Sequence, residues 1–171
     1  MEFSALIQAR YSVRAYKPDP VPDAALQQVL EAARLAPTAD NRQPFRIVVI
    51  PTAGREEALR RIYSRGWFVQ APLVICVCTV PAEAWARRKY DGKPYADVDA
   101  AIVMDHLILA ATDAGLGTCW IAAFDPAAAR EVLELPAGVE PVLFTPLGYP
   151  ADAPGPKRRK PLADLCRVLP G

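Results

Sequence analysis

Residues 37 to 50 read Pro-Thr-Ala-Asp-Asn-Arg-Gln-Pro-Phe-Arg-Ile-Val-Val-Ile, a polar turn that leads directly into an apolar run. Pro37 and Pro44 restrict the backbone and remove two amide donors, while the Thr, Asn and Gln side chains gather hydrogen-bonding groups in a small volume. The apolar residues that follow are typical of a buried strand. The stretch therefore predicts a sheet strand that begins at a polar turn, and such a turn is able to hold the polar edge of a flat heterocycle.

Helices and strands alternate on both sides of this stretch. Apolar residues recur at helical spacing in several segments and form short continuous runs in others. The expected helices are 2–9, 23–35, 54–65, 96–114 and 126–133, and the expected strands are 46–51, 72–80 and 139–148, with residues 118–122 extended. The Pro- and Gly-rich tail 149–161 is expected to lack regular structure. At 171 residues the chain predicts one domain, 1–171, of the α+β or α/β class.

Local signals refine two of these helices. Asp125 directly precedes the helix predicted from residue 126 and is expected to cap its first turn. In the charged helix 54–65, Glu56 and Glu57 are spaced to pair with Arg60 and Arg61 on a solvated face. That charge run is therefore interpreted as surface.

Composition excludes several classes of protein. Twenty Lys and Arg residues against nineteen Asp and Glu residues give a net charge of +1, which is not the footprint of a general nucleic-acid binder. No apolar run reaches membrane-spanning length, and residues 1–10 lack the apolar core of a secretory signal. We expect a cytoplasmic protein with no membrane partner. Its four cysteines are expected to be reduced, buried thiols: Cys76, Cys78, Cys119 and Cys166.

Several familiar catalytic and metal patterns are missing. Cys76 and Cys78 share a strand face, but the second ligand pair of a zinc site is absent, so no metal is expected. His106, the sole histidine, lies mid-helix without ligand or triad partners at a suitable spacing. Residues 115–120, Gly-Leu-Gly-Thr-Cys-Trp, lack the third glycine of a dinucleotide fingerprint and follow a helix, so Gly115 is interpreted as a helix cap.

Two basic clusters lie at opposite ends of the chain. Arg10 and Arg14, with Ser12 between them, are suited to bind phosphate oxygens, and Lys157-Arg-Arg-Lys160 supplies further cations. A phosphate held between the chain ends would explain both clusters. Solvated surface charge is the alternative for either cluster taken alone.

Five segments in order resemble the successive motifs of the FMN-dependent nitroreductase family. They are Arg10-Tyr-Ser-Val-Arg-Ala-Tyr16, Ala36-Pro-Thr-Ala-Asp-Asn-Arg-Gln-Pro-Phe45, Gly115-Leu-Gly-Thr-Cys-Trp-Ile-Ala-Ala-Phe-Asp125, Leu147-Gly-Tyr-Pro150 and Lys157-Arg-Arg-Lys-Pro161. One such motif is weak, but five at plausible spacing across nearly the whole chain are specific. The chain resembles a short member of the family with a reduced lid.

The resemblance implies an α+β, nitroreductase-like three-layer α-β-α fold with a central mixed or antiparallel sheet. It implies an intertwined homodimer with FMN at the interface. Arg10, Ser12 and Arg14 would hold the phosphate and the pyrimidine side of the flavin, and the turn 37–43 would line the ring from the partner chain. The full set of implied cofactor-binding residues is Arg10, Tyr11, Ser12, Arg14, Pro37, Thr38, Ala39, Asn41, Gln43, Trp120, Ile121, Ala122, Ala123, Lys157 and Arg159.

The implied activity is that of an NAD(P)H oxidoreductase. NADH or NADPH would give a hydride to FMN N5, and a small electron-poor acceptor, nitroaromatic or quinone-like, would then take the electrons in a ping-pong cycle. No catalytic side chain is needed: the backbone amides of Ala122 and Ala123 would approach the flavin, and Arg14 would offset the charge of the reduced ring.

Residues 85–95 occupy the place of a variable lid in the family. Trp85, Tyr90 and Tyr95 would stack on an aromatic substrate, and the neighbouring cations would meet a nicotinamide phosphate or an acidic acceptor. A mobile surface loop with ordinary charges is the alternative.

Two other functions remain open on the same scaffold. One is a specialised flavin chemistry, such as reductive dehalogenation, dehydrogenation of a heterocycle or fragmentation of the flavin. The other is a non-catalytic FMN-binding module that acts as a sensor or store. The sequence separates these poorly, because all of them need the same phosphate and ring contacts.

Overall fold

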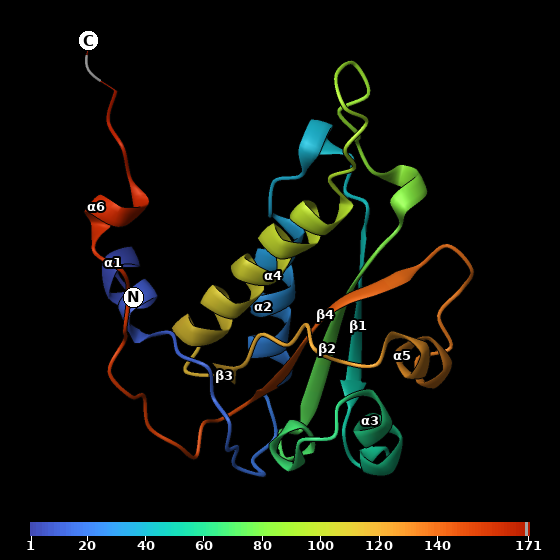
Figure 1. Cartoon of the computed structure of the whole chain (residues 1–171). Helices are drawn as coiled ribbons and strands as arrows, with labels where there is room; N and C mark the ends of the chain where they lie inside the picture. Colours follow the sequence, from blue (N-terminus) through green and yellow to red (C-terminus); the bar gives the residue numbers. More distant parts are fainter. Residues whose placement is uncertain (170) are drawn as a thin grey trace.

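The computed structural model describes residues 1–169 and 171, and its centre is one four-stranded sheet (Figure 1). The strands are β1 (Phe45–Pro51), β2 (Leu73–Thr79), β3 (Gly117–Thr118) and β4 (Glu140–Gly148), in the spatial order β1-β2-β4-β3. All three neighbouring pairs are antiparallel. Because the strands are interleaved with helices in a single antiparallel sheet, the α+β prediction is confirmed.

Six α-helices and three 3₁₀ turns connect these strands within the described residues. The α-helices are α1 (Phe3–Ala9), α2 (Asp23–Arg34), α3 (Glu56–Ile62), α4 (Ala96–Asp113), α5 (Pro126–Val132) and α6 (Leu162–Leu165). The 3₁₀ turns are η1 (Ala39–Asn41), η2 (Gly66–Val69) and η3 (Pro81–Glu83). The predicted helices and strands are confirmed with shifts of at most three residues at their ends, where helices fray and strands lose their partners.

Helices α2 and α4 cover one face of the sheet and bury the larger core. Alternate side chains of a strand point to opposite faces, so Ile75 and Val77 of β2 face these helices. They pack with Val29 of α2 and with Met104 and Leu107 of α4, all fully buried. The central position of α4 explains why its sequence is apolar around most of the helix.

Helices α3 and α5 cover the other face. Val74, Cys76 and Cys78 of β2 point to this side and pack with Leu59 of α3 and Ala129 of α5. The sheet is therefore sandwiched between two helical layers, and the three-layer α-β-α prediction is confirmed (Figure 1).

The two expected helix caps are present, but the expected ion pairs are not. The Asp125 carboxylate accepts hydrogen bonds from the N–H groups of Ala127 and Ala128 at 2.9 and 3.0 Å, and Gly115 has the positive φ of 74° that a C-terminal cap requires. Arg61 pairs with Glu131 of α5 at 2.5 Å. The prediction that it pairs within its own helix is wrong, because α5 packs beside α3 and brings a carboxylate closer.

Three of the four cysteines are buried, as predicted. The Sγ atoms of Cys76 and Cys78 lie 3.5 Å apart on one face of β2, and Cys119 is buried beside β3. Cys166 is exposed, so the prediction is wrong for this residue. It follows α6 in the tail, where no helical layer or strand covers it.

The N-terminal helix and the C-terminal tail lie together at one side of the sheet, away from the main body (Figure 1). The Lys157 ammonium donates a hydrogen bond of 2.7 Å to the carbonyl of Ile7, which joins the two segments. Large apolar side chains of the tail are exposed, namely Leu162, Leu165, Val168 and Leu169, each at 65% or more. Among the described residues, no helix has both the length and the apolar character needed to cross a bilayer.

Candidate functional site

The two basic ends of the chain meet in one cavity of about 510 Å³. Six of the sequence-predicted residues line it: Arg10, Tyr11, Ser12, Arg14, Lys157 and Arg159. Arg158 also lines its wall. Clusters separated by more than 140 positions in the sequence thus form a single cationic site, which we call the clamp.

Strand β3 positions the N-terminal half of the clamp. The N–H of Val13 donates to the carbonyl of Thr118 at 2.9 Å, and Ser12 forms a parallel bridge with Thr118. Gly117 permits this close approach, because a Cβ atom there would lie 2.7 Å from Cγ2 of Val13. The segment between Arg10 and Arg14 is therefore held at the edge of the sheet, where both arginines line the cavity.

Asp152 holds the two halves of the clamp together and was not anticipated from the sequence. Its carboxylate accepts hydrogen bonds from the Tyr11 hydroxyl at 3.1 Å and from the N–H of Arg14 at 2.8 Å. The Tyr11 hydroxyl also lies 2.9 Å from the Asp152 carbonyl. No spacing or charge pattern marks this residue, since its partners are about 140 positions away in the chain.

The electrostatics of the clamp favour an anion. Desolvation, followed by the nearby charges of Arg10 and Arg159, lowers the pKa of Lys157 below the usual range for lysine. Asp152 is the one carboxylate that lines the cavity, and its oxygens already accept from Tyr11 and Arg14. Crowded cations without matching carboxylates fit a phosphate group, which would satisfy several of them at once.

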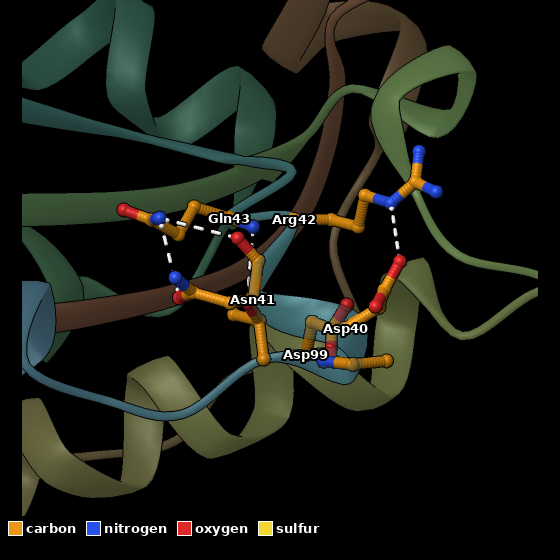
Figure 2. A network of polar contacts seen from close by, with 7 residues as sticks. Asp40, Asn41, Arg42, Gln43 and Asp99 are labelled. Atoms are coloured by element: carbon orange, nitrogen blue, oxygen red, sulfur yellow. Dashed lines mark hydrogen bonds and ion pairs between the residues drawn. The ribbon is translucent and has the colours of Figure 1, made fainter.

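The polar turn of residues 37–43 forms a second structured site near the start of α4 (Figure 2). Asp40, Asn41 and Gln43 have φ values of 55°, 50° and 51°, a left-handed conformation that non-glycine residues adopt rarely. The N–H of Gln43 donates to the Thr38 hydroxyl at 2.9 Å, and the Gln43 amide donates to Asn41 Oδ1 at 3.3 Å. Three left-handed residues in one turn make its backbone conformation uncommon, and such conformations are concentrated at functional sites.

Asp99 fastens this turn to α4 and was also missed by sequence reasoning. The residue is buried in the first turn of the helix, and its Oδ1 accepts a hydrogen bond of 2.8 Å from the N–H of Ala39 (Figure 2). Its Oδ2 is buried without a hydrogen-bond partner among the described residues. An acidic residue in a first helical turn is common, so its position gave no signal for this long-range contact.

The segment 120–123 leaves β3 beside the clamp. Ile121 is buried, and both its N–H and its carbonyl bond to Phe144 at 2.9 Å, so the N–H of Ile121 is not available to a ligand. Trp120, Ala122 and Ala123 are exposed. No intramolecular hydrogen bond involves the N–H of Ala122 or Ala123 in the described part of the chain, and these two donors stay available.

Within one chain the clamp and the turn do not meet. The turn contacts Asp99 at the start of α4, whereas Arg10 and Tyr11 of the clamp line a small cavity with Thr112, beside the Asp113 that pairs with the Met1 amino group at the end of α4. At about 1.5 Å per residue, these two carboxylates are separated by roughly 20 Å along the helix axis. The clamp and the turn therefore lie at opposite ends of α4.

The predicted lid, residues 85–95, forms a hairpin. Ala86 and Pro94 form an antiparallel bridge, and the N–H of Tyr95 donates to the Trp85 carbonyl at 3.1 Å. Trp85 and Tyr95 pack edge to face with centroids 5.2 Å apart. Tyr90, in contrast, is exposed at the tip. Only Tyr90 therefore presents most of its ring to solvent.

A family model described as Nitroreductase family matches residues 7–67 and 63–149. The chain therefore belongs to the nitroreductase family. A crystal structure of a nitroreductase family protein from Clostridium difficile 630 is 37% identical, covers 98% of each chain and superimposes with a TM-score of 0.87.

Two curated relatives show what similar proteins are called. A protein of Thermus thermophilus named NADH dehydrogenase is 31% identical over 90% of this chain and 89% of its own length. A protein of Bacillus subtilis named FMN reductase [NAD(P)H] is 30% identical over 88% of this chain and 66% of its own length.

Proposed function

We propose that the chain is an FMN-dependent NAD(P)H oxidoreductase, formed by a single domain over residues 1–171. It would transfer a hydride from NADH or NADPH to an electron-poor acceptor, such as a nitroaromatic or a quinone, by a ping-pong mechanism. The observation that carries this proposal is the clamp, which gathers cations from both chain ends around one cavity. Family membership and the names of the two relatives support the choice of flavin and nicotinamide.

The clamp residues fit the phosphate of FMN. Arg10, Arg14 and Arg159 offer forked guanidinium donors, and Ser12 adds a hydroxyl. Desolvation, followed by the charges of Arg10 and Arg159, lowers the pKa of Lys157, and a bound anion would offset this by favouring the charged form. FMN, when bound, would supply the chemistry of accepting and returning a hydride.

The chain itself supplies orientation and fixed charge. The free N–H groups of Ala122 and Ala123 are rigidly placed, because the paired backbone of Ile121 precedes them. Such donors do not titrate and keep their position as charge on a bound ring changes. Arg14 is held by the bond from its N–H to Asp152, and its guanidinium would offset negative charge on the ring.

We further propose that the site is shared by two copies of the chain. The turn 37–43 lies roughly 20 Å along α4 from the clamp, so one chain cannot wrap both groups around the same ring. The exposed apolar side chains of the tail would be covered by a partner subunit. Asn41 of one chain would then serve the flavin anchored by the clamp of the other. The cytoplasmic location stays a prediction.

The first experiment measures flavin binding to the purified protein. We expect a yellow protein that holds one FMN per chain and is bleached anaerobically by NADH or NADPH. Arg10→Ala should weaken FMN binding by at least about tenfold, because one charged phosphate contact is lost. Riboflavin, which lacks the phosphate, should bind both proteins equally, and Arg60→Ala is the matched control, because Arg60 is exposed on α3 and does not line the clamp cavity.

The outcomes separate the open functions. A colourless protein that cannot be reconstituted with FMN contradicts every flavin function. Bound FMN that neither nicotinamide reduces favours the non-catalytic module or the specialised chemistry. Equal loss of FMN and riboflavin affinity in Arg10→Ala contradicts the phosphate contact.

The shared site has its own test by subunit complementation. Arg10→Ala and Asn41→Ala chains are each expected to bind FMN poorly. Co-expressed heterodimers should recover tight binding at half of their sites. One of the two sites then combines Arg10 from the Asn41→Ala chain with Asn41 from the Arg10→Ala chain, and the other site lacks both. If both residues served the same flavin from one chain, no heterodimer would recover an intact site.

A further inference from the structure

A second cavity of about 510 Å³ lies between the lid hairpin and the turn 37–43, and nothing in the proposed flavin contacts uses it. It is lined by Arg42, Ala84, Trp85, Ala86, Arg87, Arg88, Lys89 and Tyr90. Four of these residues are cations and none is a carboxylate. A cavity of this size suits a small ligand, and its charge selects for a negative one.

The four cations are not equivalent. Arg87 is engaged by the hairpin itself, since its guanidinium contacts Asp91 at 2.9 and 2.5 Å and the Tyr95 hydroxyl at 3.2 Å. Arg42 pairs with Asp40 at 2.9 Å. Arg88 and Lys89 have no ion pair with a carboxylate among the described residues. They are therefore the cations available to an incoming anion.

Aromatic rings border the same charges. Trp85 is fixed edge to face by Tyr95, whereas Tyr90 exposes 77% of its surface and has the Lys89 ammonium 5.7 Å from its ring centroid. An exposed ring beside an unpaired cation is suited to a flat ligand that carries negative charge. Tyr90 and Lys89 both line the cavity.

Arg42 connects this cavity to the proposed flavin site. It lies between Asn41 and Gln43 in the chain, and in Figure 2 its side chain extends to the opposite side of the turn from that of Gln43. The turn thus presents amides on one side and borders the basic cavity on the other. A ligand in the cavity would lie next to a flavin ring held by the turn.

We infer that this cavity binds a planar aromatic group bearing negative charge, held by Arg88 and Lys89 and stacked against Tyr90. The inference rests on the proposed function, because it assigns the group to a redox partner of the flavin. Two sources have this chemistry. One is the adenosine 2′-phosphate of NADPH, and the other is an acceptor such as an aromatic carboxylate.

The test compares pairs of more anionic and less anionic probes by calorimetry on the FMN-loaded protein. Adenosine 2′,5′-bisphosphate against adenosine 5′-monophosphate represents the NADPH source, and 4-nitrobenzoate against 4-nitrobenzyl alcohol represents the acidic acceptor. The Arg88→Ala/Lys89→Ala double variant should bind one of the two more anionic probes at least about tenfold more weakly than the parent protein does. Its affinity for the less anionic probe of the same pair should fall by less than about twofold. Arg60→Ala is the matched control, because α3 lies at the opposite end of the sheet from the hairpin (Figure 1).

Selective loss of the bisphosphate identifies the NADPH source, and selective loss of nitrobenzoate identifies the acidic acceptor. Unchanged affinity for both, or an equal loss in Arg60→Ala, overturns the inference. FMN content and anaerobic bleaching by NADH are measured on the same samples. If these are normal while the probes do not discriminate, only the inference fails; if the parent protein binds no FMN, the proposed function fails and the inference falls with it.

Discussion

The carboxylate of Asp99 accepts a hydrogen bond of 2.8 Å from the backbone N–H of Ala39, 60 positions earlier in the chain (Figure 2). This one bond ties the strained turn 37–43 to the start of the buried helix α4. Three left-handed residues make the turn intrinsically unfavourable, so its shape depends on such external contacts.

Removing this acceptor should loosen the turn. Asp99→Ala leaves the half-buried N–H of Ala39 unpaired, which should lower the free energy of unfolding by about 1–2 kcal/mol and weaken FMN binding. Asp99→Asn keeps a carbonyl oxygen that accepts from the Ala39 N–H, and its amide nitrogen takes the place of the unpartnered Oδ2. Its free energy of unfolding should therefore stay within about 1 kcal/mol of the parent value. Urea unfolding and FMN titration measure both effects. Equal destabilisation by the two substitutions would show that the acceptor is not what matters.

The stability of the fold and the position of the clamp segment should both depend on the close packing at Gly117. A Cβ atom in Gly117→Ala would lie 2.7 Å from a Val13 methyl group and force the neighbouring clamp segment away from β3. We expect a loss of about 1–3 kcal/mol in unfolding free energy, together with weaker FMN binding. Gly66→Ala is the control, since its Cβ would meet only Arg60 Nη1 at 3.9 Å. Thermal unfolding with and without FMN distinguishes the variants, and a Gly117→Ala protein that behaves like the control would refute the steric argument.

Helix α5 ends with an unusual residue in its C-terminal cap. The N–H groups of Glu134 and Leu135 bond to the carbonyls of Glu131 and Arg130, a Schellman arrangement that normally places glycine where Glu134 has φ 49°. Glu134→Gly should therefore stabilise the protein by about 0.5–1 kcal/mol, despite the greater freedom of the unfolded chain. Glu134→Ala removes the same side chain but keeps the Cβ atom, and it should give no such gain in the melting temperature.

The lowered pKa of Lys157 predicts a pH dependence for anion binding. Desolvation and the neighbouring arginines disfavour its charged form in the free protein, and a bound phosphate would favour that form and raise its pKa. FMN affinity should therefore fall as the pH rises through the lowered lysine pKa, with proton uptake on binding in that window. Fluorescence titrations between about pH 7 and about pH 10 measure this, because free lysines titrate near the upper limit. Lys157→Met should bind FMN more weakly and lose the added pH dependence; an unchanged profile would contradict the assignment.

Much of the fold and several groups in the site were accessible from the sequence. The apolar run after Pro44 and the alternation of helices and strands gave the elements of the three-layer architecture, because hydrophobic periodicity is a local property of the chain. Asp125 was identified as a cap since capping acts over only three residues. Family motifs named the residues that line the clamp, although their roles stay predictions.

The residues whose environment the sequence predicted wrongly or did not mark all depend on contacts between distant parts of the chain. Arg61 has a suitable carboxylate within its own helix, but the packing of α5 offers Glu131 instead. Cys166 has the apolar character of a core residue, yet it lies in a tail that the chain does not cover. Asp99 and Asp152 carry no local signal, because each acts on a backbone N–H at least 60 positions away.

The sequence by itself determined most of the secondary elements, the caps and the order of the motifs, since each of these depends on neighbours within a few residues. Only the tertiary structure decided that Arg10 and Lys157 share a cavity, that Asp99 holds the turn of Asn41, and that the two groups lie at opposite ends of α4. These relationships depend on how helices pack on the sheet, and that packing joins residues whose separation along the chain leaves no periodic trace.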